Sequence, residues 1–129
     1  MSSFLIPKHE LENYKKKEEI IKLTAEQIIK DFNQFGLDVS FSGVIQYAYN
    51  ELFEQLQKHI VKLLNTNTQK LYSLLYQIDL SENKIRNIYG DNPERNLSEI
   101  ITELVLDREL KKVVTRIYFK ENPDALKNL

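Results

Sequence analysis

Apolar residues recur along the chain at the three- and four-residue spacing that is typical of amphipathic helices. The first such pattern covers residues 11–35 and ends at Gly36, whose tolerance of a positive φ suits the position just after a helix. Inside this pattern, residues 24–27 have the form of a capping box, in which Thr24 and Gln27 satisfy backbone N–H groups at a new helix start. The pattern therefore predicts a long first helix with a break near Thr24.

The middle of the chain predicts two further helices. A connector over residues 37–43 is expected to bury Val39 and Phe41, and Ser42 is a candidate cap for the helix that follows. That helix, over residues 44–64, keeps one apolar face, made of Ile45, Tyr49, Leu52, Phe53, Leu56, Ile60, Leu63 and Leu64. A turn at residues 65–68 leads to a helix over residues 69–78. Because this helix is apolar around most of its circumference, we expect it to be the most enclosed one.

Two more helices complete the pattern. A short helix capped by Ser81 ends at a turn over residues 90–93. The last helix begins near Asn96, continues to about Lys120, and is stopped by Asn122 and Pro123. Strand patterns are nearly absent, and no repeat or linker interrupts the chain. The sequence therefore predicts an all-α fold, a compact bundle of five to six helices in a single domain over residues 1–129, with loose ends at 1–9 and 122–129.

The last helix changes its apolar side halfway along. At about 100° per residue, its first half carries one apolar face, made of Leu97, Ile100, Ile101, Leu104 and Val105. Its second half carries the opposite face, made of Leu106, Leu110, Val113, Val114 and Ile117. A rigid helix on one core cannot bury both. Either the helix breaks near Asp107, or its neighbours cover the two halves on different sides, or another subunit buries the second half.

The charges of the chain are divided in the same region. The formal net charge is −1, but residues 79–107 hold seven acids and three bases, whereas residues 108–120 hold five bases and one acid. The helix dipole accounts for this order. The same order would also let the helix pair antiparallel with its twin. Together with the second apolar face, this favours a homodimer or a protein partner that contacts Leu110, Val113, Val114 and Ile117.

Two alternatives depend on other residues. A basic stripe interleaved with Tyr118 and Phe119 would suit nucleic acid, and it consists of Arg108, Lys111, Lys112, Arg116 and Lys120. The near-neutral charge and the lack of a helix-turn-helix signature make nucleic acid the less favoured partner. A third interpretation is a small-ligand pocket lined by Tyr49, Tyr72 and Tyr76.

Composition removes most enzyme chemistry. The chain has no cysteine, three glycines and two histidines, which excludes a thiol nucleophile, a cysteine zinc site and a glycine-rich phosphate loop. Glu99, Glu103 and Asp107 share a helix face that we expect to be solvated. We therefore predict no catalytic residue, cofactor or metal. Apolar runs are too short for a secretory signal or a membrane span, so we expect a cytoplasmic, non-enzymatic protein-interaction module.

Overall fold

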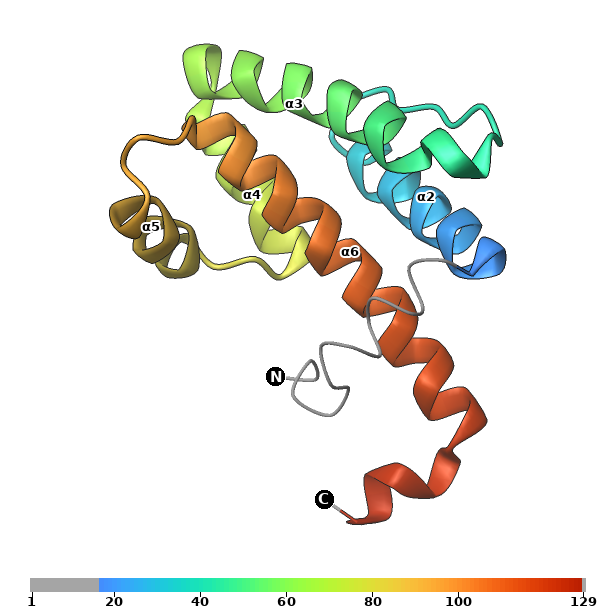
Figure 1. Cartoon of the computed structure of the whole chain (residues 1–129). Coiled ribbons are helices and arrows are strands. Elements are labelled where there is room, and N and C mark those ends of the chain that lie inside the picture. The colour runs from blue at the N-terminus through green and yellow to red at the C-terminus, as the bar shows by residue number, and fades with distance from the viewer. Residues whose placement is uncertain (1–16, 129) are drawn as a thin grey trace.

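The computed structural model describes residues 17–128 (Figure 1). This part of the chain contains five α-helices and two short 3₁₀ helices. In chain order they are α2 (Glu18–Asn33), η2 (Ile45–Tyr47), α3 (Ala48–Thr66), α4 (Thr68–Ile78), α5 (Glu82–Asp91), α6 (Leu97–Glu121) and η3 (Pro123–Asn128). This part of the chain contains no strand, so the predicted all-α bundle is confirmed. The expected loose start and residues 11–16 of the first pattern lie outside the described residues, and η3 occupies most of the expected loose end.

Helix α6 is the element around which the others are arranged. It contacts α2, α3, α4 and α5, and Figure 1 shows it crossing the molecule before its C-terminal end extends past the other helices. The main core lies between these helices, and its large, fully buried side chains include Phe32, Leu56, Ile60, Leu71 and Val105. None of the described helices combines the length and the apolar character that a membrane span requires.

Helix α4 is not the most enclosed helix, so that prediction is wrong. Its buried residues, Leu71, Leu74, Leu75 and Ile78, form one face. Tyr72 and Tyr76 point outward and are 44% and 86% exposed. The pattern misled because a tyrosine counts as apolar, although its hydroxyl also allows it to stand in water.

Helix α2 runs through Thr24 without a break, which overturns the predicted capping box. The Thr24 hydroxyl donates a hydrogen bond to the Ile20 carbonyl, one turn earlier, at 2.7 Å. Such a bond leaves the helical backbone ladder intact. The end of the helix is as predicted, because Gly36 has φ +71° and the Leu37 N–H donates to the Phe32 carbonyl at 3.1 Å. This is the hydrogen-bond pattern of a Schellman motif.

The predicted turn residues cap three of the helices. The side chains of Asn67, Ser81 and Asn96 accept hydrogen bonds from backbone N–H groups at the starts of α4, α5 and α6. Ser42 does not cap α3, because η2 separates the two and the Ser42 hydroxyl donates to Glu51 instead, at 2.8 Å. Before α3, the connector buries Val39 and packs the half-buried Phe41 against the core, as expected.

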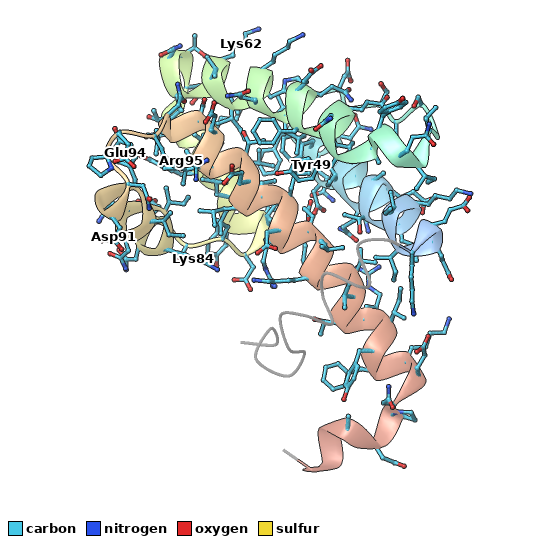
Figure 2. The ribbon with its side chains drawn as sticks, in the orientation of Figure 1. Tyr49, Lys62, Lys84, Asp91, Glu94 and Arg95 are labelled. Carbon is cyan, nitrogen blue, oxygen red and sulfur yellow. The ribbon has the colours of Figure 1, made fainter. Side chains whose placement is uncertain are left out.

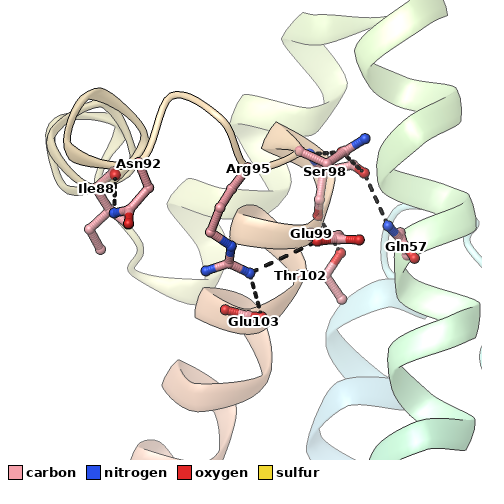
Figure 3. Close-up of polar contacts among 9 residues, drawn as sticks. Gln57, Ile88, Asn92, Arg95, Ser98, Glu99, Thr102 and Glu103 are labelled. Carbon is pink, nitrogen blue, oxygen red and sulfur yellow. Dashed lines mark hydrogen bonds and ion pairs between the residues drawn. The ribbon is translucent and has the colours of Figure 1, made fainter.

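The start of α6 is tied to its neighbours by polar contacts (Figure 3). The Arg95 guanidinium lies 2.7 Å from Glu103 and 4.0 Å from Glu99. From α3, the Gln57 amide donates to the buried Ser98 hydroxyl at 3.2 Å. The Thr102 hydroxyl donates to the Ser98 carbonyl at 2.7 Å, so the buried polar groups in this turn are satisfied.

Helix α6 is continuous past Asp107 and buries its two halves on different sides. Ile101 and Val105 of the first half belong to the main core. In the second half, Leu110, Val113 and Val114 form a second apolar cluster with Ile20 of α2. Of the three explanations for the switch of face, the one in which neighbours cover both sides describes this chain.

Candidate functional site

A groove opens between α2, the η2–α3 segment and α6, and we call it the α2–α3–α6 groove. Its volume is about 570 Å³. The apolar part of its lining comes from all three elements and includes Ile21, Ile45, Leu52, Leu106 and Leu110. Its polar and charged lining consists of Thr24, Gln46, Tyr49, Glu103 and Asp107. This volume lies in the range of roughly 300–1,000 Å³ that is common for binding sites.

The connector before α3 is held in place by two α3 side chains. Glu51 accepts hydrogen bonds from the Ser42 N–H and hydroxyl at 2.9 and 2.8 Å. Gln55 accepts from the Ser40 N–H at 2.9 Å and donates to the Ser40 carbonyl at 2.7 Å. These paired bonds fix the path of the connector into η2, whose first residue, Ile45, forms part of the groove wall.

Tyr49 is the aromatic residue of the groove, and in Figure 2 it lies between α3 and α6. Its ring stacks on Phe53 with centroids 5.9 Å apart, yet the residue is still 48% exposed. Burial raises the pKa of Tyr49, the carboxylates of Glu103 and Asp107 raise it further, and Arg95 opposes them. The carboxylates of Glu103 and Asp107 thus lie close enough to this hydroxyl to disfavour its ionisation.

Both charged residues that line the groove are acids. Each has a cationic partner outside the lining, since Arg95 lies 2.7 Å from Glu103 and Lys111 lies 2.9 Å from Asp107. Both carboxylates remain partly exposed and so can accept further hydrogen bonds. The groove therefore offers an apolar floor with an acidic edge.

A buried polar cluster lies in the contact between α2 and α6, and we call it the Glu109 cluster. Glu109 is 0% exposed, and its Oε1 lies 2.8 Å from the Lys112 ammonium. The same ammonium lies 3.0 Å from Asp31 of α2. Gln27 donates to Asp31 at 3.0 Å and accepts from Arg116 at 2.9 Å, which extends the network across both helices.

The two carboxyl groups of this cluster have opposite pKa shifts. Burial raises the pKa of Glu109 to about 8, and the hydrogen bond with Asp31 adds to this effect, against the influence of Lys112. Burial alone would raise the pKa of Asp31, but hydrogen bonds from Glu109, Lys112 and Gln27 outweigh it and hold that pKa below its usual value. At neutral pH the pair therefore holds one proton, on Glu109.

The sequence did not predict the Glu109 cluster, although a signal for it exists. Glu109 is the single acid in the basic stretch of residues 108–120, where a charged residue is expected on the surface. It follows Val105 by four residues and precedes Val113 by four, and both of these are buried. Residues at this spacing share one side of a helix, so the buried position could have been found from the spacing.

The residues predicted for self-association are placed largely inside the single chain. Leu110, Val113 and Val114 are 5%, 1% and 1% exposed, and the half-buried Ile117 packs against them. Leu110 also lines the α2–α3–α6 groove. Self-association through all four side chains would therefore require α6 to part from its neighbours in this cluster.

The predicted basic stripe is largely engaged within the chain. Arg108 lies 3.0 Å from Asp79 and also donates to the Ile78 carbonyl. Three other members are bonded as already described, Lys111 to Asp107, Lys112 to the Glu109 cluster and Arg116 to Gln27. Lys120 is exposed. The structure thus gives these cations intramolecular partners and not one continuous free stripe.

The three predicted pocket tyrosines do not come together. Tyr49 lines the groove, but Tyr72 and Tyr76 stand on the exposed face of α4 and are not part of its lining. The prediction failed because the side chains of Tyr72 and Tyr76 lie on the outer face of α4, away from the core that a pocket between helices would need.

Searches for metal sites and for similar proteins add no further feature. Within residues 17–128, no group of three His, Cys, Asp or Glu side chains could hold a metal ion. Comparison of the chain with protein-family models, with curated proteins and with solved structures found no match. The groove and its charged lining are therefore the features that bear on function.

Proposed function

We propose that this protein is a non-enzymatic, cytoplasmic interaction module that binds a protein segment in the α2–α3–α6 groove. The bound segment presents apolar side chains to the groove floor and Lys or Arg side chains to its acidic edge. The observation that supports this proposal is the combination of exposed apolar surface with charged lining of one sign.

Large hydrophobic side chains remain exposed near the start of α3. Tyr49, which lines the groove, is exposed, as are Val44 and Tyr47, which lie close to it in the sequence but outside the groove lining. Apolar surface concentrated in one place commonly marks an interaction site. Covering it would contribute roughly 25 cal/mol for each Å² removed from water.

The acidic residues at the groove edge favour a cationic partner. Glu103 and Asp107 are one helical turn apart on α6, both line the groove, and both raise the pKa of Tyr49 in the same lining. A partner with cations beside its apolar residues would pair with them, whereas an acidic partner would be repelled. Edge charges of this kind mainly set specificity and the rate of association.

Calorimetry with two amphipathic helical peptides tests this proposal. One peptide carries Leu on one face and Lys on the other, and its counterpart carries Leu and Glu. We expect the Leu/Lys peptide to bind at least about tenfold more tightly, which corresponds to about 1.4 kcal/mol. Equal binding of the two peptides would contradict the proposal.

Two matched tyrosine variants locate the binding. Tyr49→Ala should weaken the Leu/Lys peptide about tenfold, because an aromatic anchor in a groove contributes strongly. Tyr76→Ala removes a tyrosine that is outside the groove lining and should leave binding unchanged. Circular dichroism should show that both variants keep their helices. Unchanged binding by Tyr49→Ala would show that the groove is not the site.

A further inference from the structure

The Glu109 cluster has no part in the groove proposal, and it joins two of the helices that form the groove. We propose that Glu109, Asp31 and Lys112 form a proton-operated latch, which holds α2 against the second half of α6 while Glu109 is protonated and loosens when Glu109 loses its proton. This inference rests on the α2–α6 contact alone and does not depend on the proposed function.

The geometry of the cluster provides one cation for two carboxyl groups. Lys112 Nζ lies 2.8 Å from Glu109 Oε1 and 3.0 Å from Asp31 Oδ2. Although the ammonium is near, neither Glu109 oxygen accepts a hydrogen bond from the described residues. A protonated Glu109 has a hydroxyl that it can donate, and the Asp31 carboxylate, which shares the Lys112 ammonium with it, can accept.

Among residues 17–128, Asp31 and Glu109 are the only charged residues that are buried. On α6, Arg116 is bonded to Gln27, and Arg108 is bonded to Asp79 beyond the end of α4. The buried residues of α3 and α4 are all apolar. An ionised Glu109 would therefore place two carboxylates beside one ammonium in a space without solvent, which is unfavourable.

The apolar cluster that the latch borders is small, although α2 and α6 share one of the two largest helix contacts among the described residues. Its buried members are Ile20, Leu110, Val113 and Val114, and it is separate from the main core. An uncompensated charge at the edge of so small a cluster would weigh heavily in its stability. Loosening the contact would also expose Leu110, Val113 and Val114, the residues that the sequence predicts for self-association.

The direction of the pH effect follows from linkage. The pKa of Glu109 is about 8 in the closed contact, against 4.5 for an ordinary glutamate. The closed form is therefore fully favoured below pH 4.5, and opening rises about tenfold per pH unit until it levels off near pH 8. The pKa of Asp31 is lowered by the contact, so its contribution is already complete above its ordinary value of 3.8 and stays constant from pH 5 to 8.

Hydrogen–deuterium exchange across pH 5–8 measures this opening, after correction for the intrinsic exchange rate. We expect the opening constant of amides in α2 and in the second half of α6 to rise about tenfold per pH unit, while amides of α5, which buries only Ile85 and can fray without parting α2 from α6, show no such trend. In Glu109→Gln the rise should disappear. In the matched control Glu121→Gln, which removes an exposed carboxyl from the same helix, the rise should persist.

A second measurement needs no variant. The ¹³C chemical shift of the Glu109 carboxyl carbon in the wild-type protein should titrate with a midpoint near the pKa of about 8. A midpoint below pH 6 would overturn the latch. An exchange trend that persists in Glu109→Gln would overturn it as well, because that variant has no proton to lose at position 109.

Discussion

At the scale of single residues, Glu109 stands out because an ionisable carboxyl group lies in a fully buried position. Glutamate is almost never fully buried unless it is paired, and here it is paired with one shared lysine and with a second carboxyl group. The proton that Glu109 retains keeps the pair from carrying two negative charges. Burial and a neighbouring like charge therefore act in the same direction on its pKa.

The stability of the protein should depend on pH through this residue. Since the pKa of Glu109 rises from 4.5 to about 8 on folding, the folded state binds a proton that the unfolded state has released between these values. We expect the free energy of unfolding to fall by a few kcal/mol from pH 5 to pH 8, at about 1.4 kcal/mol per pKa unit. Urea unfolding of the wild type and of Glu109→Gln checks this. A wild-type stability that is constant or rises over this range would contradict it.

The hydrogen bond of Thr24 and the burial of Glu109 could not be predicted from a sequence pattern alone. A threonine followed three residues later by glutamine can cap a helix or can bond back to the preceding turn, and the choice depends on whether the chain bends there. Packing of Ile20, Ala25 and Ile28 on one continuous face of α2 decides for the unbroken helix. The burial of Glu109 likewise depends on where α2 docks, which no local pattern contains.

At the scale of elements, capping side chains define the helix starts in the second half of the chain. The Asn67 side chain accepts from the Lys70 N–H at 3.1 Å, directly after α3 ends at Thr66. The Ser81 side chain accepts from the Lys84 N–H at 3.2 Å. These bonds satisfy N–H groups that have no partner within the helix.

Removing the cap of α4 should be measurable. Asn67→Ala is expected to lower the free energy of unfolding by about 1 kcal/mol, because the Lys70 N–H loses its acceptor. Asn65→Ala, two residues earlier on the exposed side of α3, serves as the control and should change stability by less than about 0.5 kcal/mol. Equal effects of the two substitutions, measured by urea unfolding, would show that the cap contributes nothing.

Element positions could be predicted far better than element environments. The turn at residues 65–68, the cap at Ser81 and the stop at Gly36 each depend on short-range chemistry that the sequence shows directly. The outward face of α4 and the groove could not be predicted in this way, because both depend on which neighbouring helices cover a given helix. Tyr49 was selected as a site residue for its position on α3, but its partners Glu103 and Asp107 come from a helix about fifty residues later.

At the scale of the whole molecule, the acidic segment 79–107 and the basic segment 108–120 form ion pairs with each other within one chain. Asp79 pairs with Arg108 and Asp107 pairs with Lys111, so acids of residues 79–107 meet bases of residues 108–120 inside the chain. Exposed pairs of this kind contribute at most about 1 kcal/mol each. These two pairs form within one chain and need no second subunit.

Burial of both faces of α6 in one chain leads to a prediction for Val113→Lys. Because Val113 is 1% exposed, a lysine there would have to bury its charge or separate α2 from α6. We expect a loss of at least about 3 kcal/mol in unfolding free energy, with reduced helicity by circular dichroism. Self-association through this face instead predicts a wild-type dimer by light scattering and a folded monomer for the variant.

The central claim is that the α2–α3–α6 groove binds a cationic, apolar protein segment, and an NMR titration tests it most directly. Adding the Leu/Lys peptide to the ¹⁵N-labelled protein should shift the amide resonances of Ile21, Tyr49 and Leu106, one from each wall of the groove. The resonances of Tyr72 and Tyr76 on the exposed face of α4 should not move. Shifts confined to α4, or identical shifts with the Leu/Glu peptide, would contradict the claim.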